Sequence, residues 1–332
     1  MESVKPLLEV KNLHTHFFTK SGIVRAVDGV NFDVKPGETL GIVGESGSGK
    51  SITAMSILGL VPSPPGKIVD GEILFKGENL IGKTEKQMRQ IRGKEISMVF
   101  QDPMTSLNPV FSVEKQMIET IVTHEKVTKK QARERATELL NLVGIPDPHK
   151  RLKNYPHEFS GGMRQRVMIA MALSCNPSLL IADEPTTALD VTIQAQILEL
   201  FKKMQKELDM AIIMITHDLG VVSEVCDRVM VMYAGKPAEF TETKKLFDNG
   251  KHPYTLGLMN SIPKISPNKE KLKPITGLPP DLSALPTGCS FAPRCKHAME
   301  SCLSIDPSLQ KVDDNHLVRC LLYEETKKAV TT

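Results

Sequence analysis

Short apolar runs bounded by turn residues recur along the chain and alternate with amphipathic stretches of helical length. Apolar runs of this kind predict strands, whereas apolar residues recurring every three or four positions predict helices. The predicted strands span residues 7–13, 27–34, 38–43, 95–100, 179–184 and 211–215, with a hairpin over 71–80. The predicted helices span residues 52–58, 84–92, two segments within 112–143, 160–175 and 192–208. Strands alternating with helices indicate an α/β fold built on a parallel sheet.

One loop of this pattern fits the phosphate-loop motif G-x-x-x-x-G-K-[ST] at every fixed position: Gly44-Glu45-Ser46-Gly47-Ser48-Gly49-Lys50-Ser51. A predicted strand precedes the loop and a predicted helix follows it from Ile52, which is the context that the motif requires. The glycines let backbone N–H groups turn toward phosphate oxygens at a helix N-terminus, where the helix dipole favours anions. We therefore expect Lys50 to reach the β- and γ-phosphates of a nucleotide and the Ser51 hydroxyl to hold Mg²⁺.

A second pair of glycines opens a later helix. Ser160 is placed to N-cap the helix predicted over residues 160–175, and Gly161 and Gly162 leave its first amides bare. An ordinary capped core helix would account for Ser160 but not for two glycines in its first turn, since glycine weakens helices. The pattern therefore predicts a second anion site at this helix start.

Two carboxylates end a predicted strand that begins with four apolar residues. Residues 179–182 are apolar and run into Asp183 and Glu184, as expected for a central parallel strand that presents charge at its carboxyl edge. We expect Asp183 to bind Mg²⁺, directly or through water, and Glu184 to orient and polarise the attacking water. His217 follows the next apolar strand, so we place it at the same edge of the sheet and in the same site.

Two further positions lie near this chemistry. Gln101 directly follows the strand predicted over 95–100, and at such a strand end a glutamine can contact a metal or a water. Phe17 and Phe18 lie in a stretch predicted as a polar loop upstream of the phosphate loop. An aromatic there either stacks on adenine or belongs to the core, and the residues by themselves leave both alternatives open.

Composition narrows the class of protein. The chain has 332 residues, 40% hydrophobic and 24% charged, which is ordinary for a soluble globular protein of one large domain with an appendage, or of two domains. Its net charge of +3 creates no field that demands nucleic acid or an anionic membrane. The longest apolar run, residues 167–173, is too short to span a bilayer, and the N-terminus lacks the layout of a secretory signal. We therefore expect a cytosolic protein whose six cysteines do not form disulfides.

The composition changes after about residue 250, where nine of the 22 prolines lie. Four cysteines fall in this segment: Cys289, Cys295, Cys302 and Cys320. Cytosolic cysteines gathered in a proline-rich segment suggest a metal centre. Zinc sites favour tight C-x₂₋₄-C pairs, which this spacing lacks, whereas iron–sulfur clusters accept looser spacing. The spacing leaves three alternatives open: a cluster, a zinc ion or unliganded thiols. Cys175 and Cys226 lie in apolar contexts and are expected to be inert.

Taken together and in this order, the motifs resemble the nucleotide-binding subunit of an ABC transporter over about residues 7–260. The resemblance implies that residues 44–51 are the Walker A loop, Gln101 the Q-loop residue, residues 160–164 the signature, Asp183 and Glu184 the Walker B pair, Asp190 the D-loop residue and His217 the switch histidine. It also implies ATP contacts from Phe17, Gly44, Glu45, Ser46, Gly47, Ser48, Gly49, Lys50, Ser51, Ile52, Gln101, Ser160, Gly161, Gly162 and Asp190. Mg²⁺ contacts are implied for Ser51, Gln101 and Asp183, and catalysis for Glu184 and His217.

Two details of the resemblance matter for the site. Phe17 falls where the family keeps its adenine-stacking aromatic, which favours it over Phe18. Met163 stands where many members carry glutamine, but Ser160 and the two glycines that contact phosphate remain. In the family, the signature helix of one ATPase subunit completes the ATP site of the other, so the resemblance implies a sandwich of two subunits.

Residues 102–109, 159–166 and 252–255 and the cysteine-bearing tail resemble the ATPases of dipeptide/oligopeptide importers, a similarity that spans nearly the whole chain. This implies a second, related ATPase subunit in a heterodimer, two transmembrane permeases and an extracytoplasmic peptide-binding protein, with the chain peripheral on the cytoplasmic side of the cell membrane. It also implies a [4Fe–4S] cluster on Cys289, Cys295, Cys302 and Cys320, acting as a structural staple.

The expected organisation is an ABC nucleotide-binding domain over residues 1–250 and a small loop-rich C-terminal domain over 251–332. The first contains a parallel sheet, an antiparallel β subdomain and a helical subdomain over about 102–172. The expected function is to power import of di- or oligopeptides by ATP hydrolysis, with nickel or glutathione as alternative cargo on the same scaffold. A soluble ABC ATPase acting on nucleic acid is disfavoured by near-neutral charge and a single cassette. A non-hydrolysing nucleotide sensor is disfavoured by Glu184 and His217.

Overall fold

The computed structural model of the chain describes residues 5–102, 106–186, 189–261 and 275–324. They divide into two compact units. The described part of the first comprises residues 5–7, Val34–Thr39 and Leu80–Ile215 without the gaps, and that of the second comprises Leu8–Asp33, Leu40–Asn79 and residues 216–324 without the gap. None of the described helices combines the length and apolar character that a membrane-spanning segment needs.

The first unit holds three buried parallel strands, β6 (Ile96–Val99), β7 (Leu179–Asp183) and β8 (Ala211–Thr216). β7 pairs with both neighbours in parallel, with Leu179 opposite Ile96 on one side and Ala211 on the other. Their continuous apolar character follows from burial on both faces. Helix α8 (Val191–Leu208) turns an apolar stripe inward through Ile197, Phe201 and Met204. The predicted parallel sheet is confirmed.

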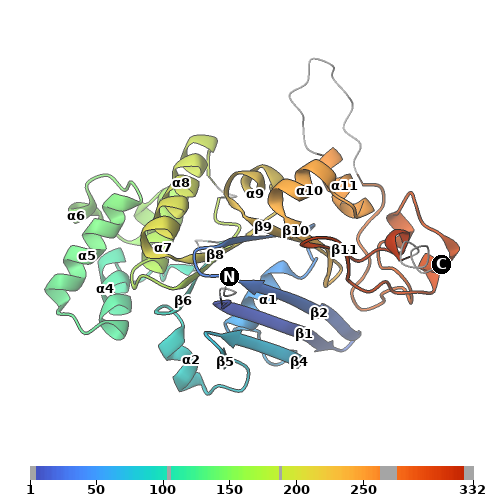
Figure 1. Cartoon of the computed structure of the whole chain (residues 1–332). Coiled ribbons are helices and arrows are strands. Elements are labelled where there is room, and N and C mark those ends of the chain that lie inside the picture. The colour runs from blue at the N-terminus through green and yellow to red at the C-terminus, as the bar shows by residue number, and fades with distance from the viewer. Residues whose placement is uncertain (1–4, 103–105, 187–188, 262–274, 325–332) are drawn as a thin grey trace, which may run out of the picture. The chain divides into compact units, whose positions relative to one another are not determined.

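The same unit holds a group of helices that lie together in Figure 1. It contains α4 (Val113–His124), α5 (Lys129–Leu142), α6 (Pro148–Arg151) and α7 (Gly161–Ala172), with the short turn η1 (Pro156–Glu158) and, elsewhere in the unit, α2 (Glu85–Ile91). Thr128 caps α5 in a reciprocal capping box with Gln131, which explains why the second helix begins where its sequence pattern begins.

The second unit contains an antiparallel sheet in the order β2-β1-β4-β5. Its strands are β1 (Leu8–Thr19), β2 (Gly22–Val34), β4 (Gly66–Phe75) and β5 (Glu78–Asn79), and they lie side by side in Figure 1. β1 pairs antiparallel with β4 along its length, out to Phe17 opposite Gly66. The prediction that Phe17 and Phe18 lie in a loop is therefore wrong, because pairing with β4 extends the strand beyond its apolar half.

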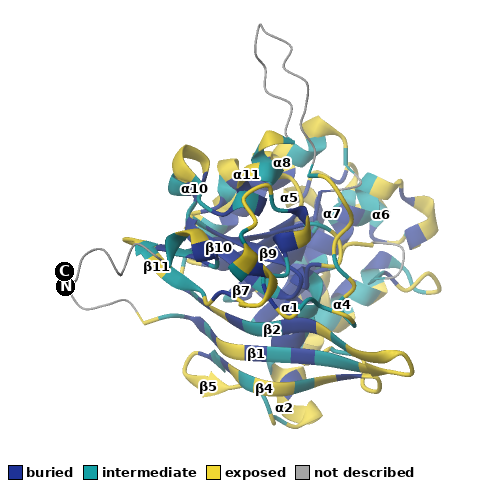
Figure 2. Cartoon of the chain, turned by 90° about the vertical axis from the view of Figure 1, so that its right-hand side faces the viewer, coloured by how far each residue is buried: buried dark blue, intermediate teal, exposed yellow. Residues whose placement is uncertain are grey.

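A second group of strands in this unit carries the phosphate loop. β3 (Thr39–Val43) runs parallel to β9 (Arg228–Tyr233), and β10 (Lys236–Glu242) and β12 (His316–Val318) continue antiparallel from β9, with β11 (Gln310–Asp313) beside β12. Figure 2 shows β9 and β10 in the buried colour, whereas β1 changes colour along its length. Thus the C-terminal segment adds strands directly beside the core of this unit.

The remaining helices of the second unit are short. They are α1 (Lys50–Ile57), α9 (Leu219–Val225), α10 (Thr243–Asn249) and α11 (Pro253–Asn260), with the single turns η2 (Ala292–Arg294), η3 (Glu300–Leu303) and η4 (Leu321–Tyr323). Apart from α10, α11, β11 and β12, the described residues after 242 are turns and irregular segments, as the proline content predicts.

Candidate functional site

The phosphate loop connects β3 to α1, as the sequence predicts. Gly44 has φ 155° and Gly49 has φ 103°, and a Cβ at either position would collide with a backbone carbonyl oxygen, that of Met232 at Gly44 and that of Ala26 at Gly49. Only glycine lets the backbone approach these neighbours so closely. Gly49 also stands at the N-cap position of α1 and offers no side-chain cap, so the first amides of this helix have no capping side chain.

Lys50 lies across the loop that precedes it. Its ammonium Nζ donates to the carbonyl oxygens of Gly44 at 2.8 Å and Glu45 at 3.0 Å, and the residue is 6% exposed. Ser51, in the first turn of α1, is half-buried. The positive group is therefore already inside the loop, and the bare helix start beside it attracts anions.

The C-terminal segment holds this loop from outside. The guanidinium of Arg294 makes a two-pronged ion pair with the Glu45 carboxylate, at 2.6 Å from Nη1 and 3.0 Å from Nη2, and its side chain is 5% exposed. The backbone N–H of Glu45 donates to the Tyr254 hydroxyl at 2.8 Å, and Arg294 also donates to the Tyr233 hydroxyl at 3.3 Å. The hydrogen bond to Glu45 raises the pKa of Arg294, and burial raises the pKa of Tyr254.

We call these contacts of Arg294 and Tyr254 with Glu45 the clamp. The sequence does not predict it. Arg294 and Glu45 are 249 positions apart, and neither spacing nor periodicity relates them. A signal was present in part, because residues 252–255 carry the resemblance to peptide-importer ATPases and include Tyr254. The rings of Tyr233, Tyr254 and Phe291 lie 4.6–5.4 Å apart and pack around the arginine.

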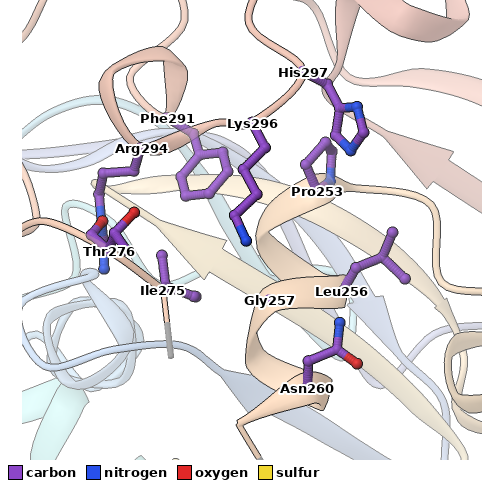
Figure 3. A pocket seen from close by; sticks show the side chains of 10 residues that line it. All are labelled: Pro253, Leu256, Gly257, Asn260, Ile275, Thr276, Phe291, Arg294, Lys296 and His297. Atoms are coloured by element: carbon purple, nitrogen blue, oxygen red, sulfur yellow. The ribbon is translucent and has the colours of Figure 1, made fainter. Parts of the chain in front are cut away.

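A cavity of about 200 Å³ opens beside this clamp. Figure 3 shows its lining, which comes from α11 and the segments around residues 275 and 294 and includes Pro253, Leu256, Ile275, Phe291, Arg294 and Lys296. None of the residues predicted to bind ATP lines it. The cavity is therefore separate from the predicted phosphate contacts.

The carboxylates lie in the first unit, at the carboxyl end of β7. Asp183 is 4% exposed, and Glu184 follows with φ 49°, a left-handed conformation that is uncommon for glutamate. The Glu184 N–H donates to the carbonyl oxygen of Ile215 at 2.9 Å, and its side chain accepts from the Gln101 amide at 2.9 Å. The structure thus brings together the strand-end glutamine and the second carboxylate, as the sequence predicts for one site.

The signature segment opens α7 in the same unit. The Ser160 hydroxyl accepts from the Met163 N–H at 3.3 Å, which confirms the predicted cap. Gly161 is exposed, and a Cβ added there would meet no atom within 4 Å, whereas one at Gly162 would lie 3.3 Å from Leu189. Asp190 caps α8 by accepting from the Ile193 N–H at 3.0 Å. Residues 187 and 188 of this turn lie outside the described residues.

Two predicted site residues remain in the second unit. His217 directly follows β8 and is exposed, and Phe17 is half-buried on β1 with its ring against Gly66, while Phe18 is 49% exposed. The predicted nucleotide contacts are thus divided between the units: the phosphate loop, Phe17 and His217 on the second, and Gln101, Ser160, Gly161, Gly162, Asp183, Glu184 and Asp190 on the first.

Two of the four tail cysteines, Cys289 and Cys302, share one small core. Cys302 belongs to a buried cluster with Ala292 and Leu321, and Cys289 and Met299 pack against it. Backbone N–H groups point at sulfur: that of His297 lies 3.3 Å from Cys295 Sγ and that of Met299 lies 3.4 Å from Cys302 Sγ. Burial raises the pKa of Cys289, Cys295 and Cys320, the last to about 11.

The spacing of the sulfurs bears on one of the predicted alternatives, the zinc ion. Among the described residues, no three of these sulfurs lie within 4.8 Å of one another. Four thiolates around one zinc ion at about 2.3 Å would lie closer together than that. N–H···S hydrogen bonds in an apolar pocket are the environment that tunes iron–sulfur clusters. This spacing is too wide for a closed zinc site and leaves a cluster and unliganded thiols as the alternatives. Cys175 and Cys226 are buried, and burial raises the pKa of both, as expected for inert thiols.

Comparisons with known proteins agree with this geometry. The family model "ABC transporter" matches residues 27–187, and the model "Oligopeptide/dipeptide transporter, C-terminal region" matches residues 238–302. The dipeptide transport ATP-binding protein DppD of Bacillus subtilis is 55% identical over 97% of this chain and 96% of its own length. The oligopeptide transport ATP-binding protein OppD of the same organism is 56% identical over 99% and 92%.

Solved structures point to the same fold. The dimeric ATP-binding cassette MJ0796, in a post-hydrolysis state bound to ADP and Pi, is 28% identical with a TM-score of 0.66. The match covers 71% of this chain and 98% of that cassette. The phosphate loop, the strand-end carboxylates and this fold define an ATP-binding cassette ATPase.

Within that class, the whole-length relatives and the C-terminal match are more specific. The chain belongs to the family of ATP-binding proteins of oligopeptide/dipeptide ABC transporters. The resemblance read from the sequence is confirmed, while the roles of the individual site residues stay predictions.

Proposed function

We propose that the chain hydrolyses ATP to power the import of di- or oligopeptides as the ATP-binding subunit of an ABC transporter. The observation that carries this proposal is its 55–56% identity, over nearly the full length, to proteins named for dipeptide and oligopeptide transport. An unbroken phosphate loop and an intact carboxylate pair in the described residues support an active ATPase rather than a sensor.

In this proposal the phosphate loop holds the β- and γ-phosphates of ATP. The uncapped amides at the start of α1 donate to phosphate oxygens. When ATP binds, the Lys50 ammonium leaves the carbonyl oxygens of Gly44 and Glu45 and pairs with the negatively charged phosphates. Phe17 stacks on the adenine, as its place on β1 upstream of the loop suggests. The Glu45 carboxylate points to Arg294, so Glu45 contributes its backbone rather than its charge.

Asp183, Ser51 and Gln101 are assigned to Mg²⁺, which neutralises charge on the transferring phosphoryl group when bound. Their carboxylate, hydroxyl and amide oxygens are the hard ligands that Mg²⁺ prefers. Glu184 orients the attacking water and accepts its proton, and the Gln101 amide at 2.9 Å fixes the direction of that carboxylate. His217, which directly follows β8, is assigned to contact the γ-phosphate.

The exposed start of α7 is proposed to act on a partner. Ser160 has its hydroxyl engaged in capping, and Gly161 presents an uncovered amide on the surface. An anion site of this kind suits the γ-phosphate of ATP bound to a second, related ATPase subunit. Two transmembrane permeases and an extracytoplasmic peptide-binding protein complete the proposed assembly, with this chain on the cytoplasmic side of the membrane.

We also propose that Cys289, Cys295, Cys302 and Cys320 hold a [4Fe–4S] cluster that ties the C-terminal segment together. Support comes from the apolar cluster around Cys289 and Cys302, from the N–H···S contacts at Cys295 and Cys302, and from a sulfur spacing wider than a zinc site needs. Protein purified without oxygen is expected to contain bound iron and to absorb broadly near about 400 nm. Cys302→Ser should lose both signals and Cys226→Ser should keep them; iron-free protein whose zinc is lost in Cys302→Ser would contradict the cluster.

The ATPase role is tested by Glu184→Gln in the assembled transporter. ATP should still bind, because the phosphate loop is untouched, while steady-state hydrolysis should fall by about 10³-fold as the group that activates water is lost. Glu199→Gln, on the exposed face of α8, is the matched control and should keep full turnover. Wild-type turnover in Glu184→Gln would refute the assignment.

The cargo is tested by uptake of labelled di- and oligopeptides in cells whose own copy carries Glu184→Gln, with no second copy to substitute. Loss of peptide uptake, with nickel and glutathione entry unchanged, supports peptide import. Normal peptide uptake with loss of nickel or glutathione entry would leave the ATPase assignment intact and move the cargo to that alternative.

A further inference from the structure

Three metal-binding side chains converge on the antiparallel sheet of the second unit. His14 and His16 lie two positions apart on β1, with ring centroids 6.0 Å apart, and Asp28 lies on β2. His14 Nδ1 is 2.9 Å and His16 Nε2 is 4.0 Å from the same oxygen, Asp28 Oδ1. In the described part of the chain, this is the one group that brings three such donor atoms within 4.8 Å.

The groups behind these side chains hold them in a ligating orientation. His14 Nε2 lies 3.1 Å from the Asn12 side-chain oxygen and Nδ1 lies 2.9 Å from Asp28 Oδ1, so both ring nitrogens have polar neighbours that fix the orientation of the ring. The other oxygen of Asp28 lies 3.3 Å from the Lys236 ammonium. Metal-bound histidines and carboxylates are held by outer hydrogen bonds of this kind.

His16 is the residue that a simple histidine–carboxylate pair leaves unexplained. Its Nε2 is buried, and no hydrogen-bond partner for it exists among the described residues. A buried polar atom without a partner is costly, and a metal ion would satisfy it.

We propose that His14, His16 and Asp28 form a binding site for a divalent transition metal such as Zn²⁺, joining β1 to β2. Two imidazoles and one carboxylate form the three-ligand set found with zinc, with the fourth position left to water. Imidazole selects such metals over Mg²⁺, so this site is chemically distinct from the Mg²⁺ of ATP hydrolysis. Lys236, also paired with Asp306 at 2.6 Å, neutralises the outer carboxylate oxygen and leaves Oδ1 for the metal.

The site touches the proposed nucleotide chemistry through the chain itself. Phe17, assigned to adenine, directly follows His16 on β1. A metal that draws His16 toward Asp28 therefore restrains the strand end from which the aromatic ring projects. This consequence rests on the proposed role of Phe17, whereas metal binding itself does not.

The test is a Co²⁺ titration of the full-length chain, followed by visible absorption and by competition with a chromophoric chelator. Wild-type protein should bind about one equivalent with d–d bands but without thiolate charge transfer, because the ligands are nitrogen and oxygen. Thiolate charge-transfer bands would report separately on the tail cysteines. Zn²⁺ should displace the cobalt.

Two variants and one control complete the test. His16→Gln and Asp28→Asn should each weaken this equivalent at least about tenfold, since each removes a direct ligand. His149→Gln, on the exposed face of α6, should leave it unchanged. If one variant fails to fold by circular dichroism, the other decides the result. Unchanged cobalt affinity in a folded variant, or cobalt bands of thiolate type only, would overturn the proposal.

Discussion

The two glycine-bearing helix starts of this protein, those of α1 and α7, differ in how much of the chain surrounds them. At α1 the backbone is closely packed, Lys50 is buried inside the loop, and Arg294 and Tyr254 hold Glu45 from the C-terminal segment. At α7 the helix has a serine cap, but Gly161 is exposed, and a Cβ added there would meet no atom within 4 Å. One anion site is completed by its own chain, and the other presents an open surface.

The difference indicates which helix start can bind phosphate within one subunit and which needs a partner subunit. A loop with preformed geometry and a resident ammonium can bind phosphate within one subunit. An exposed helix start of this kind gains from a phosphate only when a partner delivers one. Substitutions at the two sites should therefore separate ATP binding by the isolated chain from hydrolysis by the assembled transporter.

The largest contrast is expected between Gly49→Ala and Gly161→Ala. A Cβ at position 49 would collide with the Ala26 carbonyl oxygen in a left-handed backbone, so ATP binding and several kcal/mol of stability (about 4) should be lost. Gly161→Ala should stabilise the isolated chain by up to about 1 kcal/mol, because alanine favours helices. Equilibrium unfolding and nucleotide binding measure both.

In the assembled transporter, Gly161→Ala should instead reduce ATP turnover, since its methyl group would face the partner's phosphate. Full turnover of that variant would break the comparison. So would equal loss of ATP binding by both variants in the isolated chain.

A smaller effect is expected from the side chains. Lys50→Ala should weaken ATP binding to the isolated chain by about 10²–10³-fold, because a buried ammonium–phosphate contact is lost. Ser160→Ala should leave that binding unchanged and cost only about 1 kcal/mol of stability through the lost cap. Titration calorimetry distinguishes the two; unchanged affinity in Lys50→Ala would contradict the phosphate-loop role.

Tyr254, which contacts the phosphate loop at Glu45, is itself held by a titratable group, His252. Burial lowers the pKa of His252 to about 4, and its Nδ1 accepts from the N–H of Tyr254 at 3.0 Å. The unfolded chain takes up this proton near pH 6.5 and the folded chain only near pH 4, so stability falls as pH falls through that window. The loss should be about 2 kcal/mol between about pH 7 and pH 5.

Urea unfolding across this range measures the effect. His252→Asn keeps an acceptor for the helix start without titrating and should flatten the dependence. The α7 site has no comparable buried histidine at its cap, so acid should weaken the phosphate loop first. A slope unchanged by His252→Asn would refute this origin of the acid sensitivity.

The smallest effect concerns the clamp. Arg294→Met should raise the ATP concentration for half-maximal turnover about tenfold, because Glu45 loses a two-pronged partner and the loop loosens. Arg294→Lys should restore part of the affinity, and Arg319→Met is the control, since it bonds carbonyl groups of Pro237 and Pro307 and not the loop. Unaltered ATP affinity in Arg294→Met would show that the clamp only fastens the C-terminal segment.

The local motifs could be read from the sequence because their causes are local. A phosphate loop needs its glycines at fixed positions, and Ser160 caps the helix that directly follows it. Asp183 ends a strand whose run of apolar residues indicates burial. The length of β1 could not be read, because its outer half is polar and becomes a strand only through pairing with β4. Nor could the pairs Arg294–Glu45 and His16–Asp28, whose partners the fold alone brings together.

The clamp also has a consequence for how the protein is made. Synthesis proceeds from the N-terminus, and Arg294 emerges 249 residues after Glu45. At about 5–20 residues per second, the ribosome needs roughly 12–50 s to cover that distance. During this interval Glu45 has no Arg294 to pair with, and full ATP affinity is expected only after Arg294 has emerged.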